Sequence, residues 1–170
     1  MPNTEARERN RESDTMRPLL SRTAVMTSLD IVAYSRDHRR MLVVDCKMSK
    51  ESSPESAARL RRNLMQHELL DEAPFFLLAF PTGLFLWKGE AKSDELPAFS
   101  APAKPVLRTY LGKAAEDDAN IRRASLEIAL CSWLSDLVIG VRTPEANNEA
   151  DQILVQSGLY EQIRHGEVRF

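Results

Sequence analysis

Apolar residues first gather in two short runs, at residues 28–34 and 40–48, separated by the polar tetrapeptide at 35–38. Runs rich in β-branched and apolar residues on either side of a polar turn are typical of a β-hairpin. The pattern therefore predicts two antiparallel strands. A further strand around residues 23–26 has a weaker pattern.

A helix is predicted next, over residues 54–70. The Ser-Pro-Glu sequence at 53–55 supplies an N-cap serine, a proline at the first helical position and an acid in the first turn. Ala57, Leu60 and Leu64 recur at helical spacing and are expected to face the core. The continuous apolar run at 75–80 predicts a strand buried on both faces, and a turn at 81–83 leads into another strand at 84–88.

The remainder of the chain is expected to be mostly helical. Residues 89–105 contain three prolines and predict a loop, followed by helices at 106–115 and 120–139. The apolar stripe of the longer helix is expected to contain Ile121, Ala124, Ile128, Cys131 or Trp133, Leu134 and Leu137. Gly140 is a natural stop for this helix, and a last helix at 150–164 is expected to be interrupted or bent at Gly158.

These elements predict one domain over residues 18–170, with a core at about 24–88, the loop at 89–105 and a helical part at 106–170. Residues 1–17 are almost entirely polar and predict an exposed arm or a frayed helix. The fold class expected is α/β (α+β), with a mixed central sheet flanked by helices and with added C-terminal helices.

Composition narrows the function classes. The 170 residues are 43% hydrophobic and 28% charged with a net charge of −2, which argues against a protein that binds nucleic acid through bulk positive charge. No apolar run approaches the roughly 20 residues of a membrane span. The first residues lack the apolar segment of a secretory signal, so we expect a cytoplasmic protein with no membrane contact. No cysteine or histidine pair has the spacing of a zinc site.

The candidate chemistry lies in the second strand. Side chains alternate along a strand, so Asp45 and Lys47 are expected on one face and Cys46 on the other. Asp30 interrupts the first strand, and a hairpin would bring Asp30 and Asp45 together. Two such carboxylates repel unless a cation lies between them, and carboxylate oxygens suit Mg²⁺ (or Mn²⁺). An Asp–Lys pair at a strand end is also a common solvated ion pair, so the motif alone leaves both interpretations open.

Asp30, followed by Asp45-x-Lys47 in an apolar strand, a helix and another apolar strand, resembles the core of the PD-(D/E)xK nuclease superfamily, which has a restriction-endonuclease-like fold. The resemblance implies a Mg²⁺-dependent endonuclease that hydrolyses DNA phosphodiester bonds. Asp30 and Asp45 would be the metal ligands and Lys47 the lysine of the motif, while Leu29 stands where the motif has proline. The motif's helical acid has three candidates, namely Glu5, Glu8 and Glu12.

The sequence also resembles a group of small bacterial proteins with this core. The matching segments are at 53–55, 60–64, 74–78, 86–88, 132–134 and 157–160. On the helix after the motif, Arg59 and Arg62 are candidate phosphate contacts, with a solvated surface face as the alternative. A catalytically silent module that binds nucleic acid or protein is the alternative function. The C-terminal helices are a candidate surface for a homodimer or a protein partner.

Overall fold

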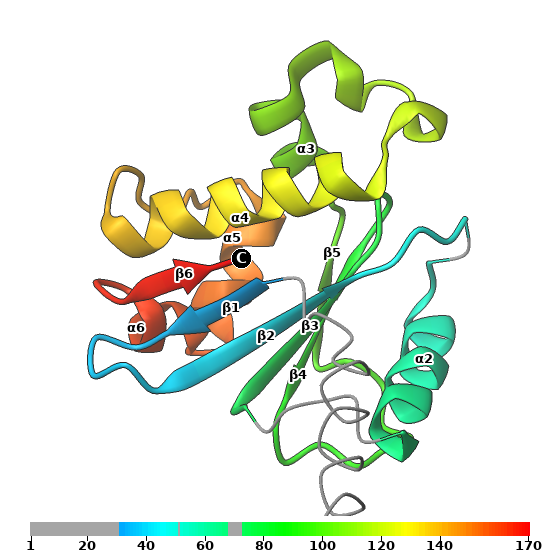
Figure 1. Ribbon diagram of the computed structural model, residues 1–170, viewed down its shortest axis with the longest axis vertical. Helices are drawn as coiled ribbons and strands as arrows, with labels where there is room; N and C mark the ends of the chain where they lie inside the picture. The colour runs from blue at the N-terminus through cyan, green and yellow to red at the C-terminus, as the bar shows by residue number, and fades with distance from the viewer. Residues whose placement is uncertain (1–30, 51, 68–72) are drawn as a thin grey trace, which may run out of the picture.

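The computed structural model describes residues 31–50, 52–67 and 73–170. This part of the chain forms a mixed α/β structure around a six-stranded open sheet in the order β5-β4-β3-β2-β1-β6 (Figure 1). The strands are β1 (Ile31–Tyr34), β2 (Arg40–Cys46), β3 (Phe75–Ala79), β4 (Leu84–Lys88), β5 (Phe99–Ala101) and β6 (Glu167–Arg169). Among these described strands, only β2 and β3 pair in parallel, and the other pairings are antiparallel.

The predicted hairpin is confirmed, because β1 pairs antiparallel with β2 and Ile31 lies opposite Val44. The ladder has an irregularity between Ala33 and Tyr34, next to the turn. β2 ends at Cys46, so it is two residues shorter than predicted. Residues 1–30 lie outside the described residues, and the predictions for the N-terminal arm, the strand at 23–26, Asp30 and the three glutamates fall there.

Helix α2 (Pro54–Gln66) makes the crossover that the parallel β2–β3 pair requires. It begins as predicted at Ser53, whose side chain accepts a hydrogen bond from the Ser56 backbone in a capping box. The helix ends at Gln66, four residues earlier than predicted. On one face of the sheet it packs Ala57 and Ala58 against Val43, while Leu60 and Leu64 are only partly buried beside this cluster.

The opposite face of the sheet is covered by the other helices, as Figure 1 shows. These are α3 (Lys104–Leu111), α4 (Arg123–Ile139), α5 (Glu149–Gln156) and α6 (Leu159–Ile163), with 3₁₀ turns at Gly112–Ala115 and Asp118–Asn120. Gly140 ends α4 in the left-handed conformation, and Gly158 separates α5 from α6, as the sequence predicts. No helix of the described ranges is long and apolar enough to span a membrane.

The core-facing side of α4 differs from the prediction. The buried residues are Leu126, Ala129, Leu130, Trp133, Leu134, Leu137 and Val138. Ala124 and Ile128 are exposed, although both were expected to be buried. The helix carries apolar residues around its whole circumference, so the periodicity did not identify one face.

Two short edge strands were not predicted. The segment at 89–105, expected to be a loop, contains β5 and the start of α3. β6 follows the last helix and pairs with β1, so that Val168 lies opposite Ala33. Three-residue strands carry little periodicity of their own and form because a neighbouring strand offers free backbone groups.

A buried carboxylate ties α4 to α5. Asp151 is fully buried and accepts two hydrogen bonds from the Arg142 guanidinium, at 2.8 and 2.9 Å. It also accepts the indole N–H of Trp133 at 2.8 Å and the backbone N–H of Glu145 at 3.0 Å. With its oxygens satisfied by four donors, the charge is compensated without water.

Candidate functional site

The candidate site lies at the carboxyl end of β2. Asp45 lies opposite Leu78 and Cys46 opposite Ala79 in the parallel ladder. The backbone N–H of Lys47 donates to the Ala79 carbonyl at 2.8 Å, so pairing with β3 continues one residue beyond the strand. This bond fixes the backbone of both motif residues relative to the sheet.

Asp45 and Lys47 are brought together as the strand alternation predicts. Lys47 Nζ lies 3.2 Å from Asp45 Oδ2, with side-chain exposures of 31% and 9%. A carboxylate that is so far removed from water requires a compensating cation or hydrogen-bond donors. Lys47 is one such partner, and its partial exposure leaves the ammonium group accessible to a molecule arriving from solvent.

The strand register determines which side of the sheet carries the site. Val43 packs in the cluster beneath α2, whereas Val44 and Cys46 belong to the larger core on the other side. Asp45 is two residues beyond Val43, so it projects toward the α2 side of the sheet. Cys46 is fully buried in the opposite core, as expected for a small hydrophobic residue.

Two hydroxyls tie the loop after Lys47 to the same end of the sheet. The side chains of Ser52 and Thr82 are hydrogen bonded to each other. Thr82 lies in the turn after β3, and Ser52 immediately precedes the N-cap of α2. The bond holds the start of the crossover against the turn. Sequence patterns did not identify this pair, since single hydroxyl residues in turns carry no distinctive spacing.

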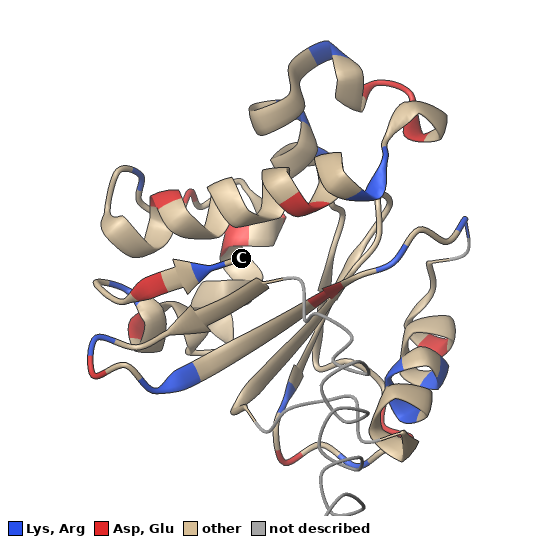
Figure 2. Cartoon of the chain, viewed as in Figure 1, with Lys and Arg blue, Asp and Glu red and all other residues tan. Residues whose placement is uncertain are grey.

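Within the described ranges, no hydrogen bond or ion pair joins the two candidate phosphate contacts on α2 to Asp45 or Lys47. Arg59 and Arg62 are both exposed, and neither has an ion-pair or hydrogen-bond partner within the described ranges. Their guanidinium groups therefore point to solvent and are available to an anionic ligand. Figure 2 shows basic positions on this helix.

Arg61, which no sequence pattern singled out, is buried, with 3% of its surface exposed. Its guanidinium lies 5.4 Å from the centre of the Trp87 ring and donates to the carbonyls of Ala91 and Lys92 at 3.1 and 2.7 Å. Burial lowers the pKa of Arg61, and the charge of Glu95 opposes this effect. Arg61 thus anchors the segment after β4 to α2. Its position four residues after Ala57 was the available signal that it lies on the buried face.

The described residues supply one of the two predicted metal ligands, Asp45. Among the described residues, no group of three or more His, Cys, Asp or Glu side chains could hold a metal. Asp45 offers buried carboxylate oxygens, which suit Mg²⁺. Asp30, the second predicted ligand, lies outside the described residues, as do the three N-terminal glutamates.

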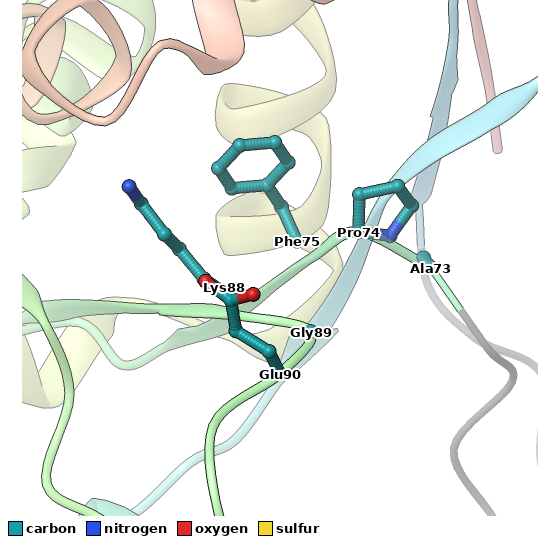
Figure 3. Close-up of a pocket in the computed structure, with 6 residues that line it drawn as sticks. All are labelled: Ala73, Pro74, Phe75, Lys88, Gly89 and Glu90. Carbon is teal, nitrogen blue, oxygen red and sulfur yellow. The ribbon is translucent and has the colours of Figure 1, made fainter.

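A pocket of about 610 Å³ lies at the far end of the same strands (Figure 3). It is lined by Ala73, Pro74, Phe75, Lys88, Gly89 and Glu90. Phe75 and Lys88 are paired in the ladder, and Figure 3 shows the lysine side chain extending on the same side as the Phe75 ring. Asp45 lies opposite Leu78, three residues further along β3. The pocket is therefore separate from the edge that carries Asp45 and Lys47.

The aromatic residues in and next to β3 and β4 are core rather than a surface for stacking bases. Phe76, Phe80, Phe85 and Trp87 are all buried, and Phe76 contacts Trp87 with ring centres 5.9 Å apart. The burial of Phe76 and Phe80 agrees with the prediction of a strand buried on both faces at 75–80. Comparisons of the chain with protein-family models, with curated proteins and with solved structures give no match.

Proposed function

We propose that the chain is a Mg²⁺-dependent endonuclease with a restriction-endonuclease-like core, acting on the phosphodiester bonds of DNA. The observation that carries the proposal is the 3.2 Å pair of Asp45 and Lys47 at the carboxyl end of β2. An acid that is nine-tenths buried adds nothing to solubility, and burying it costs free energy. Placing a lysine beside it at the rim of the sheet is what phosphodiester hydrolysis with a bound metal requires.

The order of elements supports the proposal. The antiparallel pair β1–β2, the helix α2 and the parallel strand β3 follow one another as the resemblance predicts for residues 24–88. Ile31, the neighbour of Asp30 in the chain, lies opposite Val44, the neighbour of Asp45. We therefore assign Asp30 and Asp45 together as the ligands of the metal. Bound there, Mg²⁺ would polarise the phosphate oxygens and lower the pKa of a coordinated water.

Lys47 has a separate role in this proposal. Its side chain is 31% exposed, so the ammonium group can contact the attacking water or an incoming phosphate while it remains beside Asp45. It positions that water and stabilises negative charge as the phosphorus centre becomes more crowded. Arg59 and Arg62, free on the surface of α2, are assigned to the DNA backbone.

A catalytically silent module of the same fold is the second candidate. The net charge of −2 favours it, because a DNA enzyme gains affinity from positive charge. The shortage of carboxylates around Asp45 within the described ranges favours it as well. Such a module would bind nucleic acid or a protein without cleaving it.

Calorimetric titration with Mg²⁺ and Mn²⁺, together with cleavage assays on single-stranded, duplex and branched DNA, separates the two functions. We expect Asp45→Asn and Asp30→Asn to abolish metal binding, and Lys47→Ala to retain binding and lose cleavage. Asp37→Asn, an exposed acid in the β1–β2 turn, and Lys88→Ala, at the far end of β4, are the matched controls. Circular dichroism verifies that each variant is folded.

Metal binding that is the same in Asp45→Asn as in Asp37→Asn would overturn the site assignment. Metal binding by the unaltered chain without cleavage of any of the three substrates would instead support the silent module.

A further inference from the structure

The sheet ends at β5, which is paired on one side only within the described part of the chain. β5 pairs antiparallel with β4, so that Ser100 lies opposite Phe85, and no described strand lies beyond it. Phe99 and Ala101 pack toward the larger core, while Ser100 is exposed. The outer side of β5 therefore presents a strand edge.

This edge lacks the features that normally protect an edge strand. Exposed edges are usually blunted by charged side chains or by proline, whereas residues 98–101 are Ala-Phe-Ser-Ala. Pro97 and Pro102 flank this stretch. Because proline has no backbone N–H, the two prolines limit any added pairing to the residues between them. A partner strand would thus be short, with roughly 13 Å of extended chain against the edge.

A groove of about 440 Å³ lies between this edge and α5. We call it the β5 groove, and its polar lining residues are Ser100, Asn147, Glu149, Gln152 and Gln156. A volume of this size can hold a side chain together with part of the backbone that carries it. Among the described lining residues, Glu149 alone carries a charge.

The Glu149 carboxylate is exposed and has no cation partner within the described ranges. Residues 143–163, which form the helical side of the groove, contain four acids and no lysine, arginine or histidine. Arg142 precedes them, but its guanidinium is held by Asp151 at 2.8 Å and by Glu145 at 3.5 Å. The groove is therefore negatively charged and favours a ligand that brings its own cation.

We propose that the β5 groove binds an extended segment of another protein that carries a lysine or arginine. The segment pairs with β5 as an added strand, and its basic side chain lies beside Glu149. The charge of the groove repels the phosphates of a nucleic acid. A second copy joined through the same edge would supply its own residues 97–102, which contain no basic side chain. This interaction does not depend on the proposed nuclease activity.

Random heptapeptides displayed on phage and selected on the immobilised full chain test the proposal. We expect enrichment of peptides in which β-branched residues flank a lysine or arginine, and the affinity of one such peptide is then measured by fluorescence polarisation. Glu149→Lys should weaken its binding by about tenfold, because attraction is replaced by repulsion. Glu55→Lys is the matched control, since Glu55 is also an exposed acid in the first turn of a helix, on the opposite face of the sheet. Circular dichroism verifies that both variants are folded.

N-methylation of the selected peptide tests strand pairing separately from charge. Alternate amides of an added strand face β5, so methylating one alternate set should abolish binding and methylating the other set should not. Binding that is equal for the two methylated peptides would overturn the proposal, as would equal binding by Glu149→Lys and Glu55→Lys. A selection that enriches no basic peptides would also contradict it. A dimer in sedimentation velocity that excludes the peptide would assign the groove to a second copy instead.

Discussion

Replacing Asp151 by asparagine tests how strongly one buried carboxylate holds the helical layer together. The substitution keeps the volume but removes the charge, and it places an amide N–H₂ against donors that now bond to oxygen. Removing one partner of a fully buried ion pair costs about 3–5 kcal/mol. The Arg142 side chain retains 20% exposure, so its unpaired charge is partly hydrated and the lower end of this range applies. We therefore expect a loss of about 3 kcal/mol.

Chemical denaturation followed by circular dichroism measures this loss. In a thermal scan the same change corresponds to a fall in Tm of about 6–12 °C for a chain of this size. Glu161→Gln is the control, since Glu161 pairs with Arg164 at 3.2 Å on the surface and such pairs contribute less than about 1 kcal/mol. A double-mutant cycle with Arg142→Met should show strong coupling. A cost for Asp151→Asn no larger than that of Glu161→Gln would refute the reasoning.

Three further predictions concern other parts of the fold. Arg61→Met should cost about 2 kcal/mol in urea unfolding, because the two hydrogen bonds from the guanidinium to the Ala91 and Lys92 carbonyls are lost, and limited proteolysis should then cut more readily in the segment after β4. Gly166→Ala should cost about 3 kcal/mol in the same assay, since a Cβ there would clash with the Tyr34 carbonyl oxygen. Its control is Gly140→Ala, at a left-handed position with open space around it, which should cost only about 1 kcal/mol. Burial, followed by a hydrogen bond to a carboxylate, raises the pKa of Tyr110 to about 12. Its contribution to stability should therefore be complete below pH about 10 and lost as the pH rises toward 12, so the stability difference from Tyr110→Phe should shrink across that window.

The hairpin and the helix that follows it could be predicted because their signals are local. The polar turn after Tyr34 and the Ser-Pro-Glu start of α2 each satisfy backbone groups within a few residues. Gly140 and Gly158 were equally informative, since both adopt positive φ where a helix ends or begins. These elements follow from sequence because they need no distant partner.

Tertiary context decided the remaining features. β6 forms against β1, and its three residues carry no signal of that pairing. The burial of Arg61 depends on the Trp87 ring and two carbonyls from another segment. The alternation along β2 was enough to place Asp45 beside Lys47, but no pattern in the sequence indicates how many further oxygens surround the pair. That number depends on the three-dimensional arrangement, not on spacing along the chain.

The pairing of β6 with β1 has a consequence for synthesis on the ribosome. β1 lies near the start of the described chain, and among the described residues its outer edge pairs with 167–169. During elongation at about 5–20 residues per second, the hairpin leaves the exit tunnel many seconds before its last partner does. Throughout that interval the nascent chain presents an unpaired strand edge, which other chains on the same message can bind. Slow codons late in the message would lengthen this exposure. A chaperone that covers strand edges would then act on the unpaired edge of β1.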